Sequence, residues 1–177
     1  MTDLREAFET SLVGRGGDHE KYAAGHDRPL SGYLATMVWY AGTTLALAGL
    51  TRLLGRRPPA RVSGWDLVLW TGATHKLARL VSKDAVTSPL RAPFTRYREP
   101  AGHAEVNEEV RAESSGRHAV GELVSCPFCL AVWIATGFGY GLVLAPGPTR
   151  LVMAGLTSVA GSDFLQLAYE RLKNDPD

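Results

Sequence analysis

The most reactive side chains of the sequence are those of Cys126 and Cys129, which flank Pro127 and Phe128 in the tetrapeptide Cys-Pro-Phe-Cys. On a helix, this spacing places both sulfur atoms on one face, where they can form a disulfide or bind one soft metal ion. Pro127 suits the first position of a helix, because its missing N–H would have no partner there. The positive potential at that helix end favours a thiolate, so we expect a lowered pKa for Cys126.

Three roles for the two thiols follow from this pattern. In the first they are packing side chains, and in the second Cys126 is a redox nucleophile that Cys129 resolves. The third is a metal site, for which His75 and His118 are candidate further ligands, because two thiolates are half of a tetrahedral set. The tetrapeptide also resembles the active-site motif of glutaredoxins. That fold is rejected, because an uncharged apolar segment follows the motif where strands would be needed.

Four largely apolar segments must position these side chains: residues 30–54, 63–82, 123–145 and 150–169. The first and third lack charges over about 22 residues, which at about 1.5 Å per residue is long enough to cross the hydrocarbon core of a bilayer. They are also apolar all round, unlike the helices of a soluble core. The sequence therefore predicts an all-α, polytopic membrane bundle of about four helices. The segment 63–82 is the least apolar, and a helix lying on the membrane surface is the alternative for it.

Charged and polar side chains form a predicted intramembrane cluster, provided that the segment 63–82 spans. Helix geometry places His75, Lys76 and Arg79 at a similar depth to the two cysteines, with Asp163 facing them and Glu122 at the mouth. Because charges within a bilayer are costly, we expect Asp163 or Glu122 to pair with Lys76 or Arg79. The cluster is then either a polar pocket with thiols on its wall or a set of structural ion pairs near the interface.

The remaining residues divide into a polar N-terminal tail (1–29), a long polar loop (83–119) within the membrane domain (30–172), and a short tail (173–177). Acidic and basic residues alternate in the loop, which predicts either a solvated connector or a docking site for a protein partner. Its stretch TRYREPAGHAEVNEEVR has the pattern of a small hairpin turning at Pro100–Gly102.

The distribution of lysine and arginine predicts an orientation in the cell membrane. With four spans, the side that holds both termini and the long loop is the richer in basic residues, which places the N- and C-termini in the cytoplasm. The basic cluster of residues 52–61 lies on the opposite side and opposes this assignment. The net charge of +1 provides no overall field for binding nucleic acid.

Three stretches carry a resemblance to a known family: THKLARLVSKDAVTSPLRAPF (74–94), HAEVNEEVR (103–111) and AVGELVSCPFCLAVWIAT (119–136). Together they resemble the bacterial membrane family named domain of unknown function 1360, over roughly residues 32–170. Some relatives in this family are described as sporulation-associated. The resemblance implies a membrane location and this number of helices, and it implies no activity.

The favoured function is therefore that of a non-enzymatic membrane scaffold or partner-binding protein. A thiol-redox protein and a metal-binding protein, both based on Cys126 and Cys129, are the alternatives. The sequence contains no P-loop, dinucleotide fingerprint or zinc-protease motif, so it indicates no common enzymatic chemistry and no cofactor.

Overall fold

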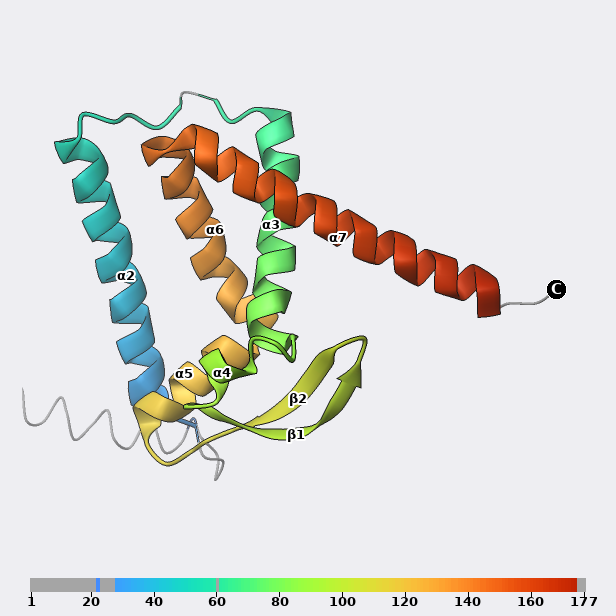
Figure 1. Cartoon of the computed structure of the whole chain (residues 1–177). Coiled ribbons are helices and arrows are strands. Elements are labelled where there is room, and N and C mark those ends of the chain that lie inside the picture. The colour runs from blue at the N-terminus through green and yellow to red at the C-terminus, as the bar shows by residue number, and fades with distance from the viewer. Residues whose placement is uncertain (1–21, 23–27, 60, 175–177) are drawn as a thin grey trace, which may run out of the picture.

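The structure is a computed structural model, and it describes Tyr22 and residues 28–59 and 61–174. They form a helical bundle with a small folded cap at one end (Figure 1). The expected tails 1–29 and 173–177 lie mostly outside the described residues. The elements are α2 (Leu30–Leu53), α3 (Gly64–Lys83), α4 (Ser88–Arg91), β1 (Thr95–Gly102), β2 (Glu105–Val110), α5 (Ser115–Ser125), α6 (Pro127–Leu144) and α7 (Pro146–Asn174).

Three of these helices, α2, α6 and α7, are long and apolar enough to cross a membrane. Their apolar side chains face outward: Trp39 and Leu45 of α2 are 73% and 72% exposed, and Leu151 of α7 is 75% exposed. Soluble monomers rarely expose apolar surface this extensively, whereas lipid-facing helices do so as a rule. The fold is therefore mostly helical with three candidate membrane spans, and α3 is not among them by composition.

The small buried core lies where α3 packs between α6 and α7. Leu69, Ala73 and Met153 are its buried members, and Trp70 of α3 donates a hydrogen bond from Nε1 to the carbonyl oxygen of Ala135 in α6. Glycines allow these helices to approach closely, because a Cβ on Gly72 would lie 2.6 Å from the Thr157 methyl group of α7. Although α3 is the least apolar of the long helices, it is therefore the centre of the bundle.

The helices alternate in direction. α2 and α6 run parallel, because the Tyr40 hydroxyl contacts Thr136 at 2.7 Å and, one turn further along both helices, the Tyr140 hydroxyl donates to the carbonyl oxygen of Thr44 at 3.1 Å. α3 runs in the opposite direction to both and connects their ends (Figure 1). α7 turns back from α6 at Pro146 and crosses α3 obliquely (Figure 1), and it runs in the same sense as α3, because Arg150 lies near Asp66 and Asp163 near Lys76.

The residues between α3 and α6 correct two expectations. The fold is not all-α, because β1 and β2 form a two-stranded antiparallel sheet. Residues 83–119 are not a long loop either, because α4, the hairpin and the start of α5 fill them. The expected hairpin exists, but its strands continue to Gly102 and Glu105, and the turn falls on His103 and Ala104, both at positive φ. We call residues 84–125 the cap.

Helix boundaries differ from the expected ones at the cysteine motif and at Pro146. The expected helix 123–145 is two helices, because Cys126 is extended between α5 and α6. Pro146 opens α7 four residues earlier than expected, since a proline is tolerated in the first turn, and α7 continues to Asn174. The expected helices 30–54 and 63–82 match α2 and α3 to within one residue at each end.

Gly32 provides a test of how the cap meets the bundle. A Cβ at this position would clash with the carbonyl oxygen of Ser115 in α5, whereas a Cβ on Gly42, in the same helix, would meet nothing within 4 Å. We expect Gly32→Ala to destabilise the protein by about 1–3 kcal/mol, through overpacking against backbone. The matched variant Gly42→Ala should be neutral or stabilising. Unfolding of both variants in mixed detergent–SDS micelles measures the difference, and equal stabilities would show that α2 and α5 are not in contact.

Candidate functional site

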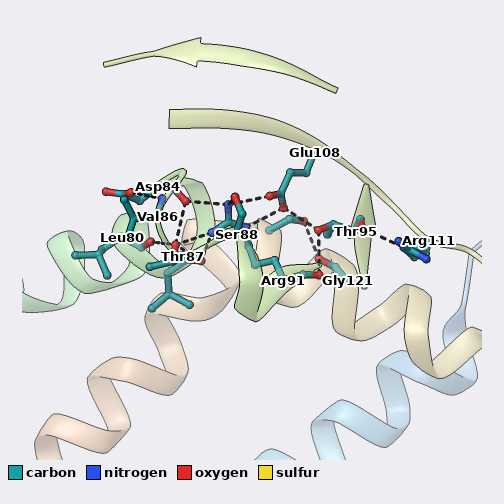
Figure 2. Close-up of polar contacts among 12 residues, drawn as sticks. Leu80, Asp84, Val86, Thr87, Ser88, Arg91, Thr95, Glu108, Arg111 and Gly121 are labelled. Carbon is teal, nitrogen blue, oxygen red and sulfur yellow. Dashed lines mark hydrogen bonds and ion pairs between the residues drawn. The ribbon is translucent and has the colours of Figure 1, made fainter. Parts of the chain in front are cut away.

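The cap is fixed to the end of α3 by Arg91, whose side chain is completely buried (Figure 2). Its Nε and Nη2 atoms donate to the two carboxylate oxygens of Glu108 at 2.8 and 2.9 Å, forming a two-pronged ion pair. The remaining donors reach the carbonyl oxygens of Val81 at 2.6 Å and Asp84 at 3.0 Å, and the Thr87 hydroxyl at 2.7 Å. A buried guanidinium with its donors satisfied joins α3, α4 and β2 in one geometry.

Glu108 is the acidic half of this junction, and its side chain is 6% exposed. Burial disfavours its carboxylate, but hydrogen bonds from Arg91 and Thr95, together with the charge of Arg91, outweigh that effect and hold the pKa of Glu108 below its ordinary value. Gly121 of α5 lies against this region, where a Cβ would be 2.5 Å from the Val110 side chain. The hairpin is therefore held in place by the Arg91–Glu108 ion pair and by the close approach of α5 at Gly121.

The outer surface of the hairpin is charged and exposed. Arg96 and Arg98 are 65% and 64% exposed, and they pair with Glu113 at 3.5 Å and Glu109 at 3.2 Å. Tyr97 of β1 is paired with Glu108 and therefore lies on the other face of the strand from these arginines, and it is 64% exposed there. In a two-stranded sheet, an outer strand edge is able to accept a further strand, and the edge of β2 is already paired at Glu105, which bridges to Asp84. The cap thus presents an ordered polar surface with an exposed aromatic side chain.

Cys126 caps α6, and both thiols are free. Its Sγ accepts a hydrogen bond from the Cys129 N–H at 3.3 Å, and Pro127 follows it in the first turn, as the sequence predicts. Burial disfavours the thiolate, but hydrogen bonds from the Cys129 thiol and from backbone N–H groups, with the nearby charge of Lys83, outweigh it. The pKa of Cys126 is therefore below its ordinary value.

Alkylation of Cys126 tests this arrangement. The lowered pKa means that folding favours the thiolate, so the stabilisation is present above the unfolded pKa of about 8.5 and is lost as pH falls through the folded pKa. In Cys129→Ser, Cys126 is the sole thiol and keeps a hydroxyl donor, so its iodoacetamide rate should reach half-maximum below about pH 8.5. In Cys129→Ala the donor is absent, and the midpoint should rise. Identical midpoints in the two variants would contradict the proposed hydrogen bond.

The charges of α3 have partners on α7 and on the hairpin. Lys76 Nζ lies 2.6 Å from Asp163 Oδ2, which is one of the expected pairs. Arg79 instead binds Glu105 of β2, at 2.6 Å. A pair that sequence reasoning missed joins Asp66 to Arg150, with two hydrogen bonds of 2.8 and 3.0 Å.

The sequence offers Glu122 as a partner for Lys76 or Arg79, but the structure pairs it with neither. It accepts a hydrogen bond from the Tyr33 hydroxyl of α2 and lies 3.6 Å from His118 and from Arg28. Its contacts therefore join α5 to the start of α2. This arrangement separates the expected polar cluster into ion pairs made by three different sets of elements.

The histidines do not complete a metal site with the thiols. The His75 ring stacks on Phe164 of α7 at 6.1 Å between ring centroids, and His118 faces Glu122. Across the residues that the structure describes, no three side chains of histidine, cysteine, aspartate or glutamate converge on one point. The structure thus gives no support to the expected set of Cys126, Cys129, His75 and His118.

Arg91 and Glu108 were missed as site residues by sequence reasoning. Both stand in a segment of alternating charges, where each looks like one more solvated side chain. The usable signal was the stretch Ser88-Pro89-Leu90-Arg91, in which a proline starts a short helix immediately after α3. That geometry turns Arg91 back toward the carbonyl oxygens at the end of α3, which have no partners within the helix.

These features define a mostly helical membrane protein with a folded polar cap. The family "Protein of unknown function (DUF1360)" matches residues 69–169, and the chain belongs to this family. The chain is also similar to "Sporulation protein YjcA" of Bacillus subtilis (strain 168), with 36% identity over 77 residues. That match covers 42% of this chain and 64% of the relative, so the chain spans less than two thirds of the length of the protein it matches. No solved structure matches the chain.

Proposed function

We propose that the chain crosses the membrane four times, with α3 as the fourth span. α2 and α6 run parallel and both have the length and composition of a span. If both cross, the chain must return between them, and α3 is the helix that connects the end of α2 to the start of α6 (Figure 1). A surface position for α3 would leave the parallel direction of α2 and α6 without a return path.

Charge pairing explains how a helix as polar as α3 tolerates this position. Its three charges before the last turn are paired: Asp66 with Arg150, Lys76 with Asp163, and Arg79 with Glu105. Pairing within a bundle is the usual condition for charges at membrane depth. The lipid-facing surface is then supplied mainly by α2, α6 and α7, and α3 adds Leu67 and Val68, which are about half exposed.

Four spans place both termini and the cap on one side of the cell membrane. This side contains most of the lysine and arginine residues, so the positive-inside rule supports a cytoplasmic location for it. The contact of His103 with Glu170, at 3.8 Å, brings the end of α7 to the hairpin and supports the same arrangement.

On this membrane base, the chain functions as a non-enzymatic scaffold whose cap binds a cytoplasmic protein partner. The observation that carries this proposal is the buried Arg91–Glu108 pair, which holds an exposed polar hairpin in a fixed position. A connector would not need such a device, because a solvated loop spans the same distance without a core. Preorganisation of this kind lowers the entropic cost of binding a partner.

Photo-crosslinking in native membranes tests the docking surface. A benzoylphenylalanine at Tyr97, on the hairpin, should give one discrete protein adduct that disappears when Arg91→Met releases the cap. A probe at Trp65, which is 70% exposed at the end of α3 away from the cap, is the matched aromatic control and should not trap the same partner. Absence of an adduct at Tyr97, or the same adduct in the Arg91→Met background, would contradict the proposal.

A thiol-redox role is the second candidate, and the lowered pKa of Cys126 favours it. The Cys126 thiolate would attack a disulfide of a partner protein, giving a mixed disulfide and releasing one partner thiolate. The Cys129 thiolate would then displace the second partner sulfur, leaving Cys126–Cys129 oxidised and the partner reduced. Cys129→Ser should trap the mixed disulfide and Cys126→Ser should not. If Cys129→Ser traps no mixed disulfide, this candidate fails.

A further inference from the structure

A cleft of about 800 Å³ opens at the end of the bundle away from the cap. Its wall is apolar and comes from α2, α3 and α6, with Ala48, Trp70, Tyr140 and Val143 among the lining residues. Ligand sites typically measure about 300–1,000 Å³, so the cleft has the volume of a small-molecule site. It lies apart from the cysteines and from the Arg91 junction.

The mouth of this cleft is strongly basic. Arg52, Arg56, Arg57 and Arg150 line it together with one acidic residue, Asp66, giving a formal net charge of +3. Asp66 is already bound by Arg150 through two hydrogen bonds. Within the described part of the chain, no carboxylate lies within ion-pair distance of the other three arginines, and all three are exposed.

The position of this mouth matches the region of lipid headgroups. α2 ends at Leu53, so Arg52, Arg56 and Arg57 lie where the chain leaves the proposed span. The apolar wall continues from there into the depth occupied by α2 and α6. A ligand that satisfies both parts needs an anionic phosphate at the mouth and a hydrocarbon chain along the wall.

We propose that this cleft binds one anionic phospholipid, with its phosphate among Arg52, Arg56 and Arg57 and an acyl chain beside Ala48. Charge complementarity carries the assignment, since three guanidinium groups with no carboxylate partner among the described residues line an apolar cleft. It also accounts for a basic cluster on the side that the positive-inside rule leaves poor in basic residues. The inference rests on the four-span arrangement proposed above.

Native mass spectrometry of the full chain in detergent tests the site with phosphatidylglycerol and phosphatidylcholine as probes. We expect one phosphatidylglycerol to be retained in preference to phosphatidylcholine. The triple variant R52Q/R56Q/R57Q should weaken retention at least about tenfold, because each of these basic residues attracts the anionic headgroup. The triple variant R96Q/R98Q/R117Q removes the same charge from the cap and should bind as the wild type does.

A second pair of variants tests the apolar part without changing charge. Ala48→Phe fills the cleft and should abolish selective retention, whereas Ala46→Phe, on the outward face of α2, should not. Equal retention in the wild type and the R52Q/R56Q/R57Q variant, or in Ala48→Phe and Ala46→Phe, would overturn the proposal. Displacement of the lipid by an equal concentration of inorganic phosphate would overturn the phospholipid as occupant. If these lipid-binding tests fail while cysteine labelling still shows four crossings, the lipid site is wrong and the four-span arrangement remains supported.

Discussion

Replacing Arg91 with methionine is expected to detach the cap and to cost about 3–5 kcal/mol of local stability, because it leaves the Glu108 carboxylate buried and unpaired. Arg91 is completely buried and makes six hydrogen bonds to side chains and carbonyl oxygens. A loss of this size corresponds to about 150- to 5,000-fold faster amide exchange. Hydrogen-exchange mass spectrometry of residues 95–110 in nanodiscs measures it directly.

Two further variants show whether the loss of exchange protection comes from the buried, two-pronged Arg91–Glu108 ion pair. Arg91→Lys keeps the charge but lacks the planar fork that holds both Glu108 oxygens, so it should recover only part of the protection. Arg96→Met removes an arginine that is 65% exposed, and exposed ion pairs contribute about 0–1 kcal/mol, so the hairpin should stay protected. If the amide exchange rates of residues 95–110 in Arg91→Met stay within about threefold of those in the wild type, the Arg91 junction does not hold the cap.

Replacing Lys76 with methionine should destabilise the bundle by about 2–3 kcal/mol, which is the cost of an unpaired carboxylate at membrane depth. The reason is that Asp163 loses its 2.6 Å partner on α3. Asp163→Asn should be destabilising for the corresponding reason, since it leaves the Lys76 ammonium unpaired. SDS-induced unfolding in mixed micelles measures both variants.

The double variant Lys76→Met/Asp163→Leu is the sharper experiment, because it removes both charges together. It should be more stable than the sum of the single changes predicts, with a coupling of at least about 1 kcal/mol. An exposed pair in water couples by at most about 1 kcal/mol and often not at all. Coupling within about 0.3 kcal/mol of zero would therefore place α3 in water and not in the bundle interior.

The helices that sequence patterns predicted best are those whose environment is uniform. α2 and α6 are apolar all round, so their presence follows from length and the absence of charge, and for α2 the extent follows as well. The Lys76–Asp163 pair was also predictable, because a charge on an apolar helix needs an opposite charge. The start of α6 followed from Pro127, whose ring restricts it to the first turn.

The cap was only partly predictable, because its order depends on contacts distant in sequence. Arg91 is buried by Glu108, 17 residues away, and by the end of α3, and its one local signal is the proline that starts α4. α5 was missed because Cys126 appeared to mark only the start of a helix, whereas it also ends the preceding one. The contacts of Glu122 with α2 depend on the close approach at Gly32, which neither periodicity nor composition reveals.

In the four-span arrangement, α3 crosses the membrane and places the cap and the basic cluster of residues 52–61 on opposite sides. In a Cys126→Ser/Cys129→Ser background, single cysteines replacing Arg57 and Arg98 report on the two ends, because both side chains are exposed. A membrane-impermeant maleimide applied to intact cells should label only the cysteine at Arg57, and both should be labelled after permeabilisation. Labelling of both or of neither in intact cells would place the two ends on one side and contradict the four-span arrangement.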